Sequence, residues 1–513
     1  MDPNTAQSVV PPPSPDQTGD EVEKQWILDQ FFGGIADAEK QIIRTAYLLE
    51  KQYQFLFAQN GNILDYPNHF KINRASLLDS PATGPNVMTA LPKWIVSGQP
   101  YTSNIFIYCA DGKMFSRDIN GNYTFLFQAQ DSQGNGLGQF LGYLYYTTNS
   151  SIGLYGPLGS PAATNNDAYL TQGVNNTKNT GLAPINTAFS AVLVGHNNLL
   201  GKFDGTNWTP NILTLASGTY VRSMDFVNQM LGIAVSTNGV MAPNQTLVYI
   251  WDGANFTFNA FTPMDGPVDV LLNWKNNLLS VIGSANMLYQ GMSPVQAQQR
   301  FPKLNQADIM QILPGAVTKY KGQAMFGIYS TTSPSFQNGV YHWGNRNDNY
   351  PPGFNLDYTI STGNTTGVQI GATFGTGEQL FIGWGDSNTG TFGVDVVQDS
   401  NPYYASAFVE GSIIDDMRPV DDKNGLTLKC SHLPLNAGES IQLAFRINRG
   451  PYILSTLNQV VGSVLTKFPI IGDYAQFKEL QCKFIIGTSS GLTTPTITSI
   501  GAAYMPLLTQ SQY

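Results

Sequence analysis

The chain carries little charge. Of its 513 residues, 26 are Lys or Arg and 35 are Asp or Glu, so charged side chains make up 12% of the sequence, where a soluble domain usually has about 25%. The formal net charge is −9, and no run of Lys or Arg is long enough to neutralise a row of phosphates. These features argue against direct binding of DNA or RNA. Neutral polar residues and 51 glycines stand in place of the missing charges.

Long apolar runs and a disulfide framework are also missing. No stretch approaches the roughly 18 uninterrupted apolar residues of a membrane span, and the N-terminus lacks the basic and apolar regions of a signal peptide. The three cysteines, Cys109, Cys430 and Cys482, are odd in number, and each lies in a strand-like run. This pattern predicts buried reduced thiols. We therefore expect synthesis in a reducing cytoplasm, with neither secretion nor a membrane span.

The N-terminal part of the chain divides into an arm and a longer segment. Residues 1–20 are rich in proline and lack apolar periodicity, so they predict a flexible arm or one that only a partner orders. Within residues 21–91, apolar positions recur at helical spacing from Asp37 to Tyr53, and Asp37 can cap the N-terminus of a helix. The spacing therefore predicts one helix, with its apolar side at Ile42, Ile43, Ala46, Leu49 and Tyr53.

From about residue 92 the sequence consists of short apolar and aromatic runs separated by Asp-Gly, Asn-Gly and Asn-Asn pairs. Such pairs tolerate the positive φ that two-residue hairpin turns require. The predicted turns are Asp111-Gly112, Asn120-Gly121, Asn197-Asn198, Asp204-Gly205 and Asn276-Asn277. The strands around them are predicted at 104–110, 113–119, 122–128, 191–196, 199–203, 268–275 and 278–283.

Short motifs repeat in this region. Asn-Asn-Leu-Leu occurs at 197–200 and 276–279, and Asp-Gly-x-Asn-aromatic-Thr occurs at 204–209 and 252–257. A looser triplet, two apolar residues followed by Gly or Ser, recurs at a mean spacing of about 44 residues, which is typical of propeller blades. The repeats predict an all-β fold with a β-propeller of six to eight blades, seven being the central value. Stacked β-sandwiches and a β-solenoid are the alternatives. The triplets end at Ser116, Gly142, Gly201, Gly232, Ser280, Gly327 and Gly383.

The pattern changes again around Gly411. Two acidic pairs, Asp415-Asp416 and Asp421-Asp422, flank a proline and indicate a connection between domains. Longer strands with clear alternation follow, as is typical of a β-sandwich. The predicted division is a flexible arm at 1–20, an N-terminal segment with one helix at 21–91, a β-propeller at 92–411 and a C-terminal β-sandwich at 412–513.

Motifs for catalysis and metal binding are incomplete. Gly487 to Gly491 has the Gly-x-Ser-x-Gly spacing of a nucleophile elbow, but neither a helix pattern nor a histidine follows it. Asp118 to Asn122 resembles the start of a calcium loop, yet Ala129 stands where the bidentate Glu belongs. We therefore predict no enzyme activity, no catalytic residue, no metal site and no cofactor, and we leave the ligand-binding residues unknown. The histidines also lie singly, without the spacing of a zinc site: His69, His196, His342 and His432.

Glycine and tryptophan offer two weaker candidates. The glycine-rich stretch 134–138 precedes a strand-like run, whereas a phosphate cradle needs a helix N-terminus. Trp208, Trp251, Trp343 and Trp384 can stack on sugars, but packing between blades is the more common role of such residues. The Asp-Gly-x-Asn-aromatic-Thr turns lack the Ser-x-Asp-x-Gly order of a sialidase Asp-box. A glycosidase would also need two carboxylates at a set separation, which a sequence does not reveal.

Both ends of the chain resemble a known class of proteins. Trp26 to Lys40, WILDQFFGGIADAEK, is similar to the opening of tail-associated virion proteins of bacteriophages, where such a motif precedes a β-propeller. Residues 433–450, LPLNAGESIQLAFRINRG, and 477–504, FKELQCKFIIGTSSGLTTPTITSIGAAY, resemble their closing strands. The resemblance implies a structural subunit of a phage tail, at its tip, baseplate or tail-tube end.

Low charge, a neutral polar surface and incomplete catalytic motifs suit a subunit that buries its flanks against neighbours. We therefore expect a non-enzymatic component of the virion tail that is made in the host cytoplasm. Its expected partners are other virion proteins and further copies of itself, without direct nucleic-acid binding. The alternatives are a host receptor- or glycan-binding module of the tail and, from another class, a polysaccharide hydrolase.

Overall fold

The computed structural model describes 15 stretches of the chain, and in them the protein is all-β, with 42 strands and no helix. No described segment forms a helix long and apolar enough to cross a membrane. The predicted arm, residues 1–20, lies outside the described residues. The described stretches are 24–31, 33–35, 42–43, 54–66, 68–171, 182–237, 247–264, 266–283, 287–291, 296–300, 310–330, 337–347, 349–414, 422–471 and 476–507.

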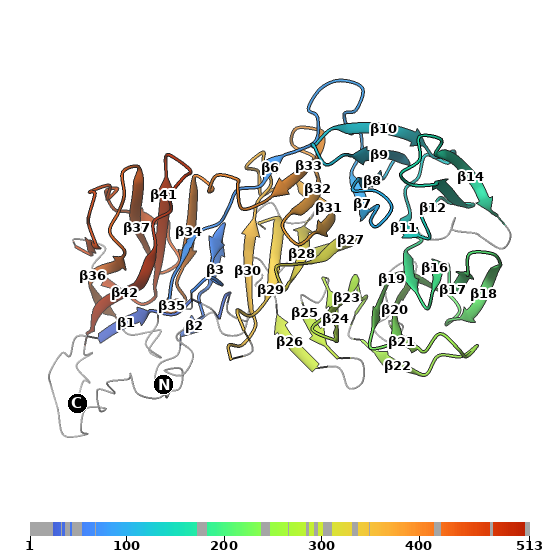
Figure 1. Ribbon diagram of the computed structural model, residues 1–513. Coiled ribbons are helices and arrows are strands. Elements are labelled where there is room, and N and C mark those ends of the chain that lie inside the picture. The colour runs from blue at the N-terminus through green and yellow to red at the C-terminus, as the bar shows by residue number, and fades with distance from the viewer. Residues whose placement is uncertain are drawn as a thin grey trace.

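Seven groups of four strands form the blades of a β-propeller (Figure 1). Seven is the central value of the predicted range. Blade one is β7 (Pro92–Ser97), β8 (Ile105–Cys109), β9 (Lys113–Arg117) and β10 (Tyr123–Gln128). Blade two is β11 (Gly136–Phe140), β12 (Tyr143–Thr147), β13 (Ile152–Gly156) and β14 (Thr164–Leu170). Blade three is β15 (Ile185–Ala188), β16 (Ala191–His196), β17 (Leu199–Phe203) and β18 (Trp208–Thr214). Blade four is β19 (Thr219–Val227), β20 (Met230–Thr237), β21 (Leu247–Trp251) and β22 (Ala260–Pro263).

The other three blades follow the same meander. Blade five is β23 (Val270–Trp274), β24 (Asn277–Ile282), β25 (Met287–Gln290) and β26 (Gln296–Arg300). Blade six is β27 (Met310–Tyr320), β28 (Gln323–Ser330), β29 (Gly339–Gly344) and β30 (Gly353–Tyr358). Blade seven is β31 (Val368–Gly375), β32 (Leu380–Asp386), β33 (Thr391–Val397) and β6 (Leu77–Leu78).

The ring closes at blade seven. The first strands of successive blades lie against one another, and β31 of blade seven lies against β7 of blade one. The fourth strand of blade seven is β6, which pairs with β33 although it precedes β7 in the chain (Figure 1). An N-terminal strand therefore completes the last blade, so the first and last blades are held together by strand pairing as well as by side-chain packing.

Apolar layers between neighbouring blades form most of the propeller core. Between blades one and two, for example, Trp94 and Tyr108 pack with Leu137 and Tyr146, and the two tyrosine rings meet edge to face with centroids 5.5 Å apart. Similar clusters lie between the other early blades and between blades seven and one. Because each sheet is covered on both faces, its inner strands are apolar on both sides rather than alternating.

The predicted hairpins are confirmed. The strands β8, β9 and β10 pair in antiparallel order, as do β16 with β17 and β23 with β24. One turn is displaced by a residue: Trp274 pairs with Asn277, so the turn is Lys275-Asn276 rather than Asn276-Asn277. Both turn residues have positive φ, 48° and 60°. The lysine adopts this backbone because the pairing of the flanking strands sets the register.

The apolar triplets do not mark one position in the blade. Gly142 lies in the turn between β11 and β12, where its φ is 82°. The predicted blade number is right because it depended on the mean spacing of the triplets and not on their phase. Ser116 and Gly201 lie on third strands, whereas Gly232, Ser280, Gly327 and Gly383 lie on second strands.

The repeated Asp-Gly-x-Asn-aromatic-Thr motif forms the turn between the third and fourth strands of blades three and four. The Asp204 carboxylate accepts amide hydrogen bonds from Thr206 and Asn207, at 2.8 and 2.7 Å. Asp252 accepts the equivalent pair in the next blade. These bonds favour the ionised carboxylate, and the amide bonds of its own turn lower the pKa of Asp204. The motif is thus a turn that the aspartate closes.

The glycine of each repeated turn receives a residue from the blade before it. A Cβ on Gly205 would lie 3.1 Å from the Leu141 side chain, and one on Gly253 would lie 2.7 Å from the Phe189 ring. Leu141 and Phe189 belong to the first hairpin turns of blades two and three, and both have positive φ. Leu141 and Phe189 are 48 residues apart in the chain, and Gly205 and Gly253 are separated by the same 48 residues. The sequence repeat therefore reflects a repeated contact between blades.

The remaining strands form a β-sandwich built from both ends of the chain (Figure 1). Two more N-terminal strands, β4 (Gly61–Asn62) and β5 (Lys71–Ile72), form a small hairpin. One sandwich sheet holds β1 (Lys24–Leu28), β42 (Ile497–Pro506), β36 (Lys423–His432), β39 (Leu465–Pro469) and β40 (Gln476–Phe477). The other holds β2 (Ile42–Ile43), β35 (Ile413–Ile414), β41 (Leu480–Thr488), β34 (Ser406–Glu410), β37 (Glu439–Ile447) and β38 (Ile453–Leu454), and it continues through β3 (Phe57–Gln59).

The N-terminal segment departs from its predicted helix. Ile42 and Ile43 form β2 and pair in parallel with β35, so the helix predicted from Asp37 to Tyr53 is wrong at these two residues. The rest of that span lies outside the described residues. Ile42 and Ile43 form a strand because β35 at the edge of the sandwich sheet offers backbone partners and because β-branched isoleucine favours strands.

Propeller and sandwich share a continuous sheet. The strand β3 pairs with β30 of blade six on one side and with β34 on the other, and β34 and β35 both pair with β41. The predicted boundary between residues 411 and 412 falls between β34 and β35. The three cysteines are free and buried, as expected, and burial raises the pKa of the Cys430 and Cys482 thiols.

Candidate functional site

A cavity of about 410 Å³ lies where blades six and seven meet the β4–β5 hairpin. Blade six contributes Gln323 and His342, and the hairpin contributes Lys71. The volume falls within the range of roughly 300–1,000 Å³ typical of small-molecule sites. We refer to this site as the interblade cavity.

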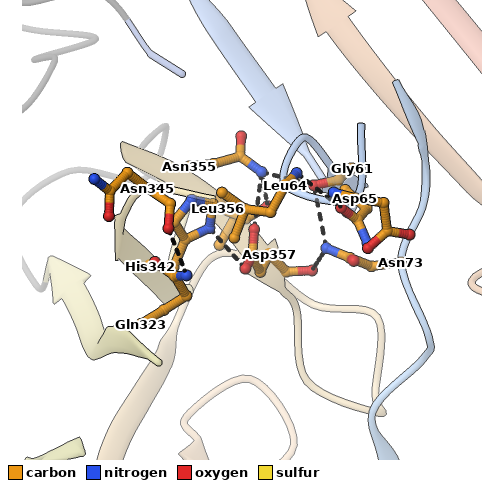
Figure 2. A network of polar contacts seen from close by, with 11 residues as sticks. Gly61, Leu64, Asp65, Asn73, Gln323, His342, Asn345, Asn355, Leu356 and Asp357 are labelled. Atoms are coloured by element: carbon orange, nitrogen blue, oxygen red, sulfur yellow. Dashed lines mark hydrogen bonds and ion pairs between the residues drawn. The ribbon is translucent and has the colours of Figure 1, made fainter. Parts of the chain in front are cut away.

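A buried histidine–aspartate pair lies at the floor of the interblade cavity (Figure 2). His342 on β29 is 0% exposed, and its Nδ1 is 2.7 Å from Oδ2 of Asp357 on β30. Asn355 donates a hydrogen bond of 2.9 Å to the other carboxylate oxygen. Asn73 bonds to the Asp357 carbonyl at 3.3 Å and to the Gly61 carbonyl at 3.1 Å. The N-terminal hairpin therefore braces the pair from outside the blade.

Asp357 reaches His342 because β30 is irregular. Val340 pairs with Tyr358 and Tyr341 pairs with Leu356, so Asp357 is the extra residue of a β-bulge. Bulges redirect side chains and are frequent beside binding sites. The register of β29 and β30 thus places a carboxylate next to a histidine that lies fifteen residues earlier.

The floor contains polar atoms that the described residues do not satisfy. His342 Nε2 and Gln323 Oε1 are buried and have no hydrogen-bond partner there. The Gln323 amide nitrogen donates to the Asn345 carbonyl at 3.1 Å, which leaves its oxygen as an acceptor. Since the Asp357 carboxylate accepts from His342, Nδ1 carries a proton, and in the neutral imidazole Nε2 is an acceptor. Buried acceptors without donors cost about 1–3 kcal/mol each, so this floor favours a ligand or solvent molecule that donates.

Cations and tyrosines surround the mouth of the cavity. Lys321 pairs with Asp399 at 2.5 Å, and Arg74 lies 3.8 Å from the Tyr403 ring. The last two cations lie over one aromatic ring, with Lys71 at 4.9 Å and Arg346 at 5.3 Å from the centroid of Tyr66.

Neither Lys71 nor Arg346 forms an ion pair with a described residue. Burial is the largest cause that raises the pKa of Tyr358, which lines the wall, so this phenol stays protonated.

The interblade cavity does not contain a nucleophilic triad. Its described lining includes no serine, threonine or cysteine, so the His342–Asp357 pair has no aliphatic hydroxyl or thiol to activate. The arrangement can bind and orient a polar ligand. It offers acceptors at the floor, tyrosine rings along the wall, and at the mouth two cations, Lys71 and Arg346, that form no ion pair with a described residue.

A second cavity, of about 390 Å³, occupies the central channel and is lined by the first strands of all seven blades. Here β27 bulges between Ile312 and Val317, and a Cβ on Gly315 would collide with the Lys93 carbonyl of blade one. The bulge therefore narrows the channel. Burial lowers the pKa of Lys93 to about 8 and raises that of Asp225.

The remaining sequence candidates take structural roles. Thr488 ends β41, and the Ser489 amide donates to the Gly438 carbonyl, so the elbow-like motif is a strand end. Asp118 accepts amide bonds from Asn120 and Asn122 at 2.9 and 2.7 Å and closes the hairpin between β9 and β10. No group of three or more metal-ligating side chains occurs within the described stretches.

The tryptophans and three of the histidines pack within the protein. Trp251, Trp343 and Trp384 are buried, and Trp251 lies in the cluster between blades three and four, as expected for packing between blades. His196 bonds to the Pro210 carbonyl at 2.7 Å. In the sequence, His342 is one of four histidines that lie singly. Only the pairing of β29 with β30 reveals its carboxylate partner, Asp357. Trp208 packs at the edge of the cluster between blades two and three, His432 bonds to Thr466 and His69 lies against Tyr66.

Comparison with known proteins gives distant likenesses among solved structures. No protein-family profile and no curated protein sequence matches the chain. A solved extracellular domain of BT4673 from B. thetaiotaomicron is 14% identical with a TM-score of 0.41; the match covers 74% of this chain and 45% of that chain. A catalytically inactive virginiamycin B lyase from Staphylococcus aureus with quinupristin is 12% identical with a TM-score of 0.42, covering 63% and 98%.

A third solved structure, YCF48 bound to the D1 peptide, is 7% identical with a TM-score of 0.41, covering 63% of this chain and all of that one. This chain thus spans less than half of the BT4673 domain and nearly the whole length of the other two. At these identities and TM-scores the likenesses carry no argument about ligands or activity, and the propeller is defined by the strand pairing of this chain itself.

Proposed function

We propose that this protein is a non-enzymatic structural subunit of a bacteriophage virion, incorporated in the tail together with other virion proteins and further copies of itself. On this proposal it is made in the host cytoplasm and ends in the particle. The assignment to a phage tail rests on the resemblance of Trp26–Lys40 and of the C-terminal segments to tail-associated virion proteins. In support, the two ends form one unit: β1 pairs with β42 over five residues.

The observation that carries an assembly role is an exposed apolar surface on the sandwich. Residues 454–465, which comprise the loop between β38 and β39 and the strand residue at each of its ends, present six large apolar side chains that are 41–68% exposed. We call this surface the apolar end loop. It consists of Leu454, Leu457, Val460, Val461, Val464 and Leu465.

The apolar end loop is held in place by its backbone. Asn458 and Ile441 exchange two hydrogen bonds of 2.8 and 2.9 Å, and the Gly462 amide donates to the Leu435 carbonyl at 2.9 Å. An ordered connection with apolar side chains is unusual, because loops are ordinarily polar. Contiguous exposed apolar surface of this kind marks protein–protein contact, which supports a subunit whose sandwich docks on a neighbour.

Peptide mass spectrometry of purified virions tests the proposal directly. We expect peptides of this chain at a constant ratio to the major tail proteins, retained through density-gradient purification. Absence of the chain from the particle, while it is present in the infected cell, would overturn the proposal.

A second candidate, a glycan-binding module of the tail, is favoured by the interblade cavity and its unsatisfied acceptors. The third, a polysaccharide hydrolase, predicts release of reducing ends from host surface polysaccharide. It has less support, because a glycosidase needs two available carboxyl groups, whereas Asp357 is engaged by His342 and Asn355 and Asp399 is paired with Lys321. A reducing-end assay on the full chain that stays at background across several host polysaccharides would remove it.

A further inference from the structure

We propose that the interblade cavity binds a carboxylated sugar unit, with the sugar hydroxyls at the floor and the carboxylate at the mouth. This inference goes beyond the virion role and does not depend on it, because it rests on the polar groups of one cavity. The ligand class follows from three properties of the cavity: acceptors at its floor, unpaired cations at its mouth and its size.

The floor selects for hydroxyl donors. His342 Nε2 and Gln323 Oε1 are buried acceptors without partners among the described residues, and the bond from Nδ1 to Asp357 sets the tautomer of the imidazole. Phosphate and sulfate oxygens are themselves acceptors and would repel this floor, whereas a sugar hydroxyl supplies the missing proton.

The mouth selects for an anion. Of the four cations that line the cavity, Lys321 is paired with Asp399, and Arg74 donates to the Asn401 carbonyl at 3.0 Å. Lys71 and Arg346 lie 4.9 and 5.3 Å from the centroid of the Tyr66 ring and form no ion pair with a described residue. Charge-assisted bonds from an ammonium and a guanidinium to one carboxylate are among the strong polar contacts of proteins.

The size of the cavity limits the ligand to about one or two sugar rings. Its volume is about 410 Å³, and tyrosines at 320, 358 and 403 form part of its wall. Aromatic faces pack well against the apolar face of a sugar ring. A hydroxylated ring with one carboxylate, as in a uronic acid, satisfies floor, wall and mouth together.

Three small probes separate these features: D-glucuronate, D-glucose, which lacks the carboxylate, and cyclohexanecarboxylate, which lacks the hydroxyls. Saturation-transfer NMR titrations on the full chain measure each dissociation constant. We expect glucuronate to bind at least about tenfold more tightly than either other probe, which corresponds to about 1.4 kcal/mol. Equal affinity for glucuronate and cyclohexanecarboxylate would reveal an anion site only, and no binding of glucuronate would leave the cavity to solvent. Either outcome overturns the proposal.

Variants locate the binding. The double variant Lys71→Gln/Arg346→Gln should weaken glucuronate to the affinity of glucose, because it removes the two unpaired cations. Lys467→Gln, on the exposed strand β39 of the sandwich, removes one positive charge far from the cavity and should leave affinity unchanged. Equal loss in both variants would reduce the effect to net charge and contradict the proposed site.

The role of His342 is measured without a substitution in the buried floor. The nitrogen-15 shift of His342 Nε2 should move on addition of glucuronate or glucose and stay constant with cyclohexanecarboxylate, since only the sugars bring a hydroxyl to that atom. A shift that is unaffected by saturating glucuronate would refute the assignment of the floor. The virion proposal is tested independently, because presence of the chain in the particle does not alter any of these affinities.

Discussion

The propeller and the sandwich bury their apolar residues differently. In the propeller, exposed large apolar side chains are spread over several blades, for example Tyr101, Ile119, Tyr169 and Phe256. In the sandwich, six lie together in the apolar end loop, and Ile27, Leu433, Ile471 and Leu492 are exposed elsewhere. A closed ring covers both faces of every blade with a neighbouring blade, whereas a sandwich covers only the inner faces of its sheets. On the proposed virion role, we therefore expect contacts with other subunits to be made through the sandwich.

The largest expected effect is on the stability of the propeller. Asp269, buried beside blade five, pairs with Arg222 of blade four at 2.5 Å and accepts the Gly283 amide at 2.9 Å. Asp269→Ala leaves a buried guanidinium uncompensated, so we expect a loss of about 3–5 kcal/mol in the free energy of unfolding. Urea denaturation measures it. The control Asp399→Ala removes an exposed ion pair and should cost less than about 1 kcal/mol; similar losses in both would contradict the expectation.

Trp26→Ala tests whether the N-terminal strand belongs to the sandwich. Trp26 on β1 is 7% exposed and packs against Gly411, where a Cβ would lie 2.6 Å from the indole. We expect a loss of about 3 kcal/mol, at the low end for a large aromatic residue because β1 is an edge strand. Hydrogen exchange should quicken in peptides of β42 and not in those of β16 and β17. Equal acceleration in both would show that the two regions unfold as one unit.

The repeated contacts between blades allow two equivalent glycines of the propeller, Gly205 and Gly253, to be compared. Gly253→Ala should destabilise by about 1–3 kcal/mol, because φ is 81° and a Cβ would lie 2.7 Å from the rigid Phe189 ring. Gly205→Ala is the matched variant: its φ is 98°, but the nearest atom is the end of the flexible Leu141 side chain at 3.1 Å. The loss should be smaller there. Thermal unfolding of the two variants, compared with the parent chain, decides the order.

The smallest effect on stability is expected in the apolar end loop. Val461 is 65% exposed, so Val461→Asp should change the free energy of unfolding by less than about 0.5 kcal/mol. A buried charge would nevertheless disrupt a docked apolar surface. We expect the variant to fold normally but to be lost from virions in a complementation assay. Normal incorporation would argue that this loop is not the contact surface.

Several parts of the fold could be predicted because their signals are local. The Asn and Gly turns, the apolar runs and their mean spacing led to the hairpins and to seven blades. The turn at Phe189-Ser190 could not be predicted, since neither residue type favours the positive φ of 52° and 53° seen there. Packing of Phe189 on Trp251 and Phe226 of the next blade, with centroids 5.5 and 5.0 Å apart, offsets that local cost.

The candidate site was missed for a related reason. His342 and Asp357 carry no motif between them, and the bulge that aligns them arises from pairing of β29 with β30. Lys71, on the N-terminal hairpin, joins the same cavity although it lies more than two hundred residues away in the chain. Sequence spacing predicts a site when its residues lie on one element. This cavity is formed by blade six, blade seven and the β4–β5 hairpin, so no spacing in the sequence reveals it.

The amino-acid sequence by itself determined the strand-rich class, the blade repeat and the scarcity of charge, because turn chemistry and apolar periodicity act over a few residues. Only the tertiary structure decided that β6 closes the ring, that β1 and β2 join the sandwich, and that a buried histidine lines the interblade cavity. These depend on backbone pairing and burial between segments far apart in the chain. Such contacts form when the whole ring closes, so no single segment carries their signal.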